Sequence, residues 1–161
     1  MANCCEITLE IVAETTDDAQ RISDGIVAER RLSYVLGKRM FIGSYDRRLD
    51  YIDFIQDGND LTLYGEVRWG ISDDEMKQIL QWLQHFGNIR MVCCHMEESG
   101  CMIYGDYEWY SDTPYRMTYT YLPDGHYPAY KDEYDDDPDQ QVADLEEAFD
   151  KHKVVEEIAC V

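Results

Sequence analysis

The chain is poor in basic residues. Its 161 residues include 14 Lys and Arg against 34 Asp and Glu, a formal net charge of −20. A domain of this length is about 40 Å across, so the excess amounts to about one charge per 2 Å, close to the value of about one per 1.7 Å for duplex DNA. Such a surface repels nucleic acids and membranes, and we expect neither as a direct partner. The simplest alternative is that the acidity only confers solubility.

Several other features are missing. The chain has no apolar run of about 18 residues and no basic segment followed by an apolar stretch at its start, so we expect neither a membrane span nor a secretory signal. It also lacks serine-elbow and phosphate-loop motifs. The four histidines are scattered: His85, His95, His126 and His152. We therefore expect no catalytic residues and no enzymatic activity.

The six cysteines raise the question of disulfides or a metal site. Two adjacent pairs, Cys4–Cys5 and Cys93–Cys94, lie in predicted strands, which suits reduced thiols in the cytoplasm. Because neighbouring strand residues face opposite ways, only one of Cys93 and Cys94 could join His95 in a zinc site. The aspartate runs lack the alternate spacing and central Gly of a calcium loop. We expect no metal and no cofactor.

Hydrophobic periodicity predicts an α+β fold. Helices are expected at about 17–31 and about 73–86, the second with a capping box from Ser72 and Glu75. Strands are expected at 4–13, 51–56, 61–69, 89–97, 101–110 and 115–122. This order predicts a ferredoxin-like antiparallel sheet with two helices on one face, extra strands and a C-terminal acidic helix.

Alternation also predicts which side chains of the sheet face the core. In the strand at 61–69, the side chains expected to point inward are Leu61, Leu63, Val67 and Trp69. Those expected to point outward are Thr62, Tyr64, Glu66 and Arg68. Nine of the 13 tyrosines lie between residues 104 and 134. Tyrosine favours both strands and interfaces, so these residues indicate either a half-buried sheet surface or a binding surface.

Charge is unevenly distributed along the chain. Residues 30–48 hold six of the 14 basic residues: Arg30, Arg31, Lys38, Arg39, Arg47 and Arg48. We interpret this segment as an internal or intersubunit partner of the acidic regions, with nucleic-acid contact as the alternative. Segment 124–161 has thirteen acids and three bases, a net charge of −10. We expect a ferredoxin-like domain at 1–123, followed at 124–161 by an acidic loop and a short docked helix near residues 140–152.

Particular residues accompany this order of elements: Met1, Ala2, Asn3 and Cys4 at the start, Trp69 before the second helix, and Glu98, Gly100 and Gly105 after it. In these positions the chain, over residues 1 to about 122, resembles the ferredoxin-like domain of the YubB-like proteins carried by plasmids and phages. It departs from that family at Gly70 and Ile71, where prolines are frequent. The resemblance implies the fold and a mobile-element origin, and it assigns no catalytic residue.

The acidic surface leads to a functional hypothesis. Carboxylates two residues apart on a strand lie roughly 6.7 Å apart, near the step between neighbouring phosphates of DNA, and Asp106 with Glu108 has this alternation. An RNA-binding sheet would instead place its aromatics among basic groups. We predict a phage or plasmid inhibitor of anti-CRISPR or anti-restriction type, a DNA mimic that blocks a nucleic-acid-binding site. The alternative is an interaction module without mimicry, either a homodimer or an antitoxin-like binder of a basic partner.

The predicted partner-binding residues are acids of the outward sheet face and of the C-terminal segment. They are Glu6, Glu10, Glu66, Asp106, Glu108, Asp132, Glu133, Asp135, Asp136, Asp137, Asp139, Asp144, Glu146 and Glu147. Their predicted partner is a basic nucleic-acid-binding protein or complex in the cytoplasm of the host cell.

Overall fold

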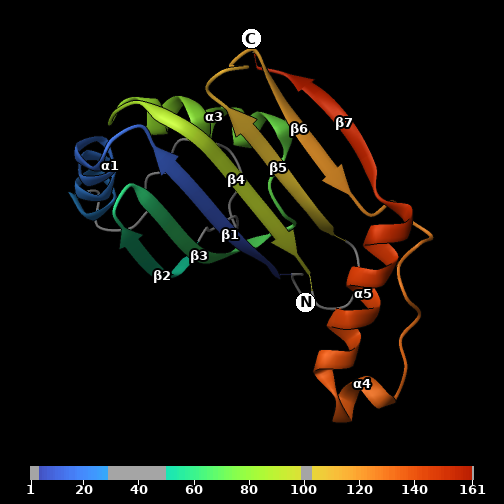
Figure 1. Cartoon of the computed structure of the whole chain (residues 1–161). Coiled ribbons are helices and arrows are strands. Elements are labelled where there is room, and N and C mark those ends of the chain that lie inside the picture. The colour runs from blue at the N-terminus through green and yellow to red at the C-terminus, as the bar shows by residue number, and fades with distance from the viewer. Residues whose placement is uncertain (1–3, 29–49, 99–102, 161) are drawn as a thin grey trace.

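The computed structural model describes residues 4–28, 50–98 and 103–160 (Figure 1). Its centre is a seven-stranded antiparallel sheet with the order β2-β3-β1-β4-β5-β6-β7. The strands are β1 (Cys4–Ala13), β2 (Asp50–Asp57), β3 (Asp60–Arg68), β4 (Ile89–Glu97), β5 (Tyr104–Tyr110), β6 (Arg116–Tyr121) and β7 (Val154–Ala159). The helices are α1 (Thr16–Ala28), α3 (Asp73–Gln84), α4 (Glu133–Asp136) and α5 (Pro138–His152). The predicted α+β class is confirmed.

Helices α1 and α3 pack on one face of the sheet and lie behind it in Figure 1. The capping box that starts α3 is present: Glu75 N–H donates to Ser72 Oγ at 3.4 Å, and Ser72 N–H donates to Glu75 Oε2 at 2.8 Å. The apolar stripe of α3, which includes Met76 and Leu83, is buried in one core cluster with alternate residues of the strands. The main core therefore lies between this helical layer and the sheet.

The predicted hairpin is formed by β2 and β3, which turn at Gly58 with a positive φ of 62°. Leu61, Leu63 and Val67 are buried, as expected. The inward placement of Trp69 was wrong, because 54% of this residue is exposed. Its backbone has a φ of 68°, so the chain leaves the strand geometry at this point and the alternation no longer applies.

The C-terminal segment contains more structure than the sequence indicated. Two helices, α4 and α5, form an arm that extends beyond the end of the sheet (Figure 1); we call residues 124–152 the acidic arm. A strand follows that we did not predict, because β7 pairs with β6 along its whole length and forms one edge of the sheet. A small second cluster, built on Tyr104, Leu122 and Leu145, packs the arm against the sheet.

Some predictions fall outside the described residues. The basic segment 30–48 lies there, as do the end of the first predicted helix beyond Ala28, residues 1–3, and Gly100 and Cys101. Within the described part of the chain, no helix is both long enough and apolar enough to cross a membrane.

Candidate protein-interaction surface

The sheet face turned away from α1 and α3 carries the acids predicted for the sheet. Strand alternation places on this side the residues that neighbour the buried ones on β3, β1, β4 and β5. We call this surface the open face; it comprises Thr62, Tyr64, Glu66, Glu6, Thr8, Glu10, Cys93, His95, Glu97, Tyr104, Asp106 and Glu108. All five sheet residues predicted to bind a partner, Glu6, Glu10, Glu66, Asp106 and Glu108, therefore lie on one surface.

Three glutamates of the open face lie side by side on three neighbouring strands, with Glu6 in the middle. The register pairs Glu6 of β1 with Glu66 of β3 on one side and with Glu97 of β4 on the other. Neighbouring strands lie about 4.8 Å apart, so the three carboxylates form a short row across the sheet. We call this row the glutamate row. Glu97 was not among the predicted residues, although the alternation of its strand would have placed it beside His95 on the same face.

The one described basic group near the middle of the open face is His95, and it is held by acids. Its Nδ1 lies 2.6 Å from Asp106 Oδ1, and its Nε2 lies 3.9 Å from Glu97 Oε2. Hydrogen bonding to Asp106 and then to Glu97 raises the pKa of His95 to about 9 against the opposing effect of burial. The imidazole is therefore protonated at neutral pH and fixes the position of both carboxylates.

The cysteines of β4 face opposite ways, as predicted. Cys94 is buried in the main core, whereas Cys93 is half-buried on the open face opposite Glu10 and Glu108. Burial and then the nearby carboxylates raise the pKa of Cys93 to about 12, which disfavours the reactive thiolate. Across the described ranges, no three His, Cys, Asp or Glu side chains are grouped closely enough to hold a metal ion.

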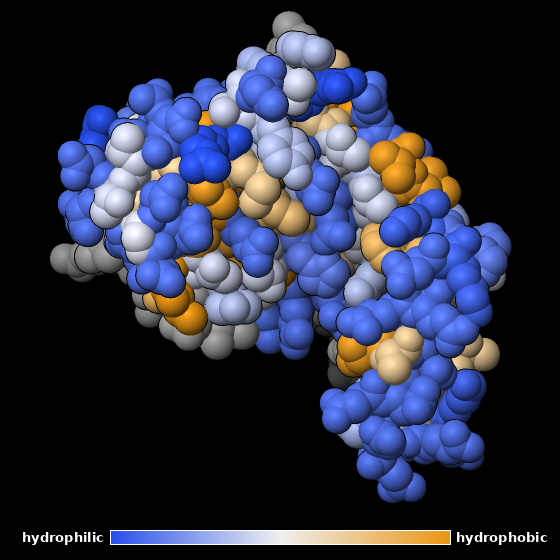
Figure 2. Space-filling view, viewed as in Figure 1, coloured by the Kyte–Doolittle hydropathy of each residue, from blue (hydrophilic) through white to orange (hydrophobic). Residues whose placement is uncertain are grey.

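The acidic arm carries the other nine predicted residues, and nearly all of them are exposed. The exception is Asp144, which accepts hydrogen bonds from Lys131 Nζ at 2.8 Å, the Tyr134 hydroxyl at 2.6 Å and Gln140 Nε2 at 2.7 Å. These bonds, that from Lys131 foremost, lower the pKa of Asp144 to about 2. Asp144 thus joins α4 to α5, while the remaining acids of the arm face solvent, and the arm in Figure 2 is mostly hydrophilic with a few apolar side chains among the polar ones.

The tyrosines of the last hairpin are divided between the two faces of the sheet. Tyr107, Tyr119 and Tyr121 stack in sequence on the side of α3, with ring centroids 4.3 and 4.9 Å apart. The Tyr107 hydroxyl donates to Asp73 Oδ1 of α3 at 2.7 Å. Of the predicted aromatic surface, these three are structural contacts, whereas Tyr104 and Tyr110 lie on the open face, Tyr104 opposite Glu97 of β4.

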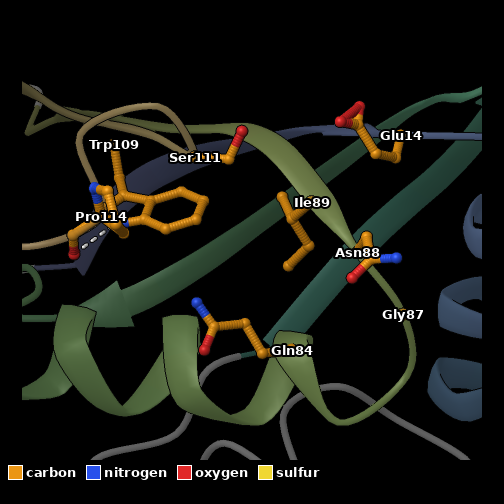
Figure 3. Close-up of a pocket in the computed structure, with 8 residues that line it drawn as sticks. All are labelled: Glu14, Gln84, Gly87, Asn88, Ile89, Trp109, Ser111 and Pro114. Atoms are coloured by element: carbon orange, nitrogen blue, oxygen red, sulfur yellow. Dashed lines mark hydrogen bonds between the residues drawn. The ribbon is translucent and has the colours of Figure 1, made fainter.

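A hollow of about 440 Å³ lies beside the end of α3 (Figure 3). Trp109, Ile89 and Gln84 point into it, and Trp109 Nε1 donates to the Pro114 carbonyl at 3.2 Å. Its acidic group, Glu14, lies 3.8 Å from Arg90 Nε. This lining provides amide and hydroxyl groups but no nucleophile paired with a base, so the acidic surface remains the stronger candidate.

No protein-family model matches the chain, and no curated protein or solved structure matches it either. The functional argument therefore depends on the physical chemistry of its surface.

Proposed function

We propose that this chain is a DNA mimic that blocks the nucleic-acid-binding site of a host defence complex. The observation that carries the proposal is the glutamate row, in which Glu66, Glu6 and Glu97 stand opposite one another on three adjacent strands. Asp106 and Glu108 extend the negative surface to a fourth strand, β5. A regular array of anions on a rigid sheet suits a groove that normally receives phosphates.

Stability alone does not account for this arrangement. Like charges directly opposite on neighbouring strands destabilise a sheet, and Glu6 has an acid on both sides. Stabilising sheets instead place opposite charges across from one another. The unfavourable register therefore supports a role in binding a positively charged partner.

Two further features support the proposal. The acidic arm adds exposed carboxylates of α4 and α5 beside the end of the sheet, so a partner could contact both surfaces. We also propose that residues 1–123 form a ferredoxin-like domain of the kind found in YubB-like proteins of plasmids and phages. The strand order β2-β3-β1-β4, with α1 following β1 and α3 preceding β4, supports this assignment, which fits a mobile-element inhibitor.

The test is phage plaquing on host cells that carry a restriction or CRISPR system and express the chain. The wild-type chain is expected to restore plaquing, and the double reversal Glu6→Lys/Glu66→Lys is expected to abolish this effect. The triple reversal of Asp135, Asp136 and Asp137 to Lys tests the arm separately. The matched control is Asp24→Lys/Asp74→Lys, which changes the charge equally on the exposed surfaces of α1 and α3. Equal loss in the control and the Glu6/Glu66 variant would count against the open face as the contact.

A second candidate function is homodimerisation through the edge strand β7. Val155 is 59% exposed and Val154 is 36% exposed on this edge, and neither a proline nor a bulge protects it. Salt separates the two functions, because screening weakens binding to a basic partner but relieves repulsion between two acidic copies. Sedimentation of the purified chain in rising salt, with Val155→Lys as the comparison, measures the dimer directly.

A further inference from the structure

Tyr104 lies where the sheet meets the acidic arm, and side chains from both enclose its ring. The ring contacts His95 of β4 edge to face, with centroids 5.1 Å apart, and Phe149 of α5 in the same way at 4.9 Å. Leu122 and Leu145 complete the contact. Only 8% of Tyr104 is exposed. The position of its hydroxyl is therefore fixed by packing from both sides.

The Tyr104 hydroxyl makes no hydrogen bond to the residues that the structure describes. The backbone N–H of Tyr104 donates to the Tyr127 hydroxyl at 3.0 Å, but the phenolic oxygen of Tyr104 itself has no such contact. That oxygen is not sealed from solvent, because no buried side-chain oxygen in the described ranges lacks a partner. A ligand that bonds to this oxygen therefore replaces water at a position that packing has already fixed.

Acidic residues of both surfaces act on Tyr104. Glu97 is directly opposite Tyr104 in the register of β4 and β5, and Asp106 follows on β5. Glu146 and Asp150 belong to α5, on either side of Phe149 in the sequence. After burial, which is the largest cause, the charges of these four groups raise the pKa of Tyr104 to about 12. The two acidic surfaces thus meet at Tyr104, where the ring of α5 residue Phe149 packs on it.

Two cations of the chain offset part of this charge. His95 lies 2.6 Å from Asp106, and Lys153 Nζ lies 3.7 Å from Asp150. Four carboxylates less two cations leave a local excess of two negative charges. Glu146, the charge with the largest effect on Tyr104 after burial, has no ion pair with any described residue, so its carboxylate remains available.

We propose that this junction receives an arginine side chain of the basic partner, with the Tyr104 hydroxyl and Glu146 as its contacts. A guanidinium has five N–H donors in a planar fork, so it can bond a hydroxyl oxygen and a carboxylate at once. A metal ion needs ligands grouped more closely than any three acidic, His or Cys side chains of the described ranges. This inference rests on the proposed function, because it names the group that the partner inserts.

L-argininamide is the probe that tests the junction without a partner. The full chain with ¹³C-labelled tyrosine rings is titrated by NMR, and Tyr104→Phe identifies the Tyr104 signals while keeping the ring. We expect these signals to shift and saturate, whereas those of exposed Tyr115 and Tyr130 do not. Glu146→Gln, at an exposed position that should not affect folding, is expected to weaken binding about tenfold, as for a hydrogen bond to a charged group. The control Glu133→Gln should change it less than twofold.

Three results would overturn the inference: shifts that never saturate, an equal effect of the Glu133 control, or an equal response to MgCl₂ at the same concentration. Its failure is distinguishable from failure of the proposed function. If L-argininamide binds as expected while the reversal of Glu6 and Glu66 leaves plaquing unchanged, the junction stands and the proposed function fails. If the titration fails while the reversal of Glu6 and Glu66 abolishes the effect on plaquing, the junction proposal fails and the proposed function stands.

Discussion

Removal of the charge on Glu6 is expected to stabilise the fold, because the residues opposite Glu6 on both neighbouring strands are acidic. Glu6 lies opposite Glu66 and opposite Glu97, so Glu6→Gln relieves two repulsive cross-strand pairs. An exposed pair of like charges costs about 0.5 kcal/mol, and two pairs give about 1 kcal/mol. For a chain of this size, that gain raises Tm by about 2–4 °C.

Glu108→Gln is the matched control, because it removes the same charge from the same face. Glu108 lies opposite Cys93 and Thr118, so the variant changes the net charge without relieving a direct repulsive pair. Comparison of the two variants separates the effect of the register from that of the general negative charge. We expect the Tm of Glu6→Gln to exceed that of Glu108→Gln.

The assay is thermal unfolding followed by circular dichroism at about 0.01 M and about 1 M salt, where the Debye lengths are about 30 Å and about 3 Å. The difference between the variants should be largest at low salt and should shrink at high salt, because opposing side chains lie about 5 Å apart. Equal Tm values at low salt would refute the argument that the glutamate row costs stability. A difference that persists unchanged at about 1 M salt would show that its cause is not electrostatic.

Three further predictions concern His95 and the acidic arm. Asp106 raises the pKa of folded His95 from 6.5 to about 9. The stabilisation from this ion pair is therefore complete below pH 6.5 and is lost as the pH rises through about 9. The free energy of unfolding measured in urea should show this decline for the wild type and not for His95→Gln. Asp144→Asn removes the carboxylate charge that pairs with Lys131, so amide exchange in α4 should accelerate while that of β1 is unchanged. Leu145→Ala should cost about 2–3 kcal/mol and expose the arm to limited proteolysis before the sheet.

Local patterns predicted the first part of the fold. The clean alternation of β1 and the capping box of α3 are short-range signals, and both elements occur where they were expected. The edge strand β7 gave no such signal, because Val154 and Val155 are followed by Glu156 and Glu157 without alternation. That strand is stabilised by distant residues: Arg116 Nη1 lies 2.6 Å from Glu157 Oε1, and the Tyr121 hydroxyl donates to Glu156 at 2.9 Å.

The candidate site was predictable only as a list of acids. Alternation placed Glu6 and Glu66 on the outward side of their strands, but their opposition became visible only with the strand order, in which β1 lies between β3 and β4. The contact between Tyr104 and Phe149 joins residues 45 positions apart and has no local signature. From the sequence, Gly105 stood out only through a family resemblance. The structure explains why glycine occupies this position, because a Cβ there would lie 2.8 Å from the Thr120 carbonyl oxygen.

The exposure of Trp69 gives the molecule an intrinsic fluorescent probe of its own electrostatic potential. Trp82 and Trp109 are each 4% exposed, whereas Trp69 is 54% exposed and follows Glu66 by three residues. Collisional quenchers therefore reach mainly Trp69. The cation caesium should quench its emission more efficiently than the anion iodide, because the surrounding field attracts one and repels the other. A docked basic protein would reduce that preference, so the ratio of the two quenching constants would report occupancy of the surface without any attached dye.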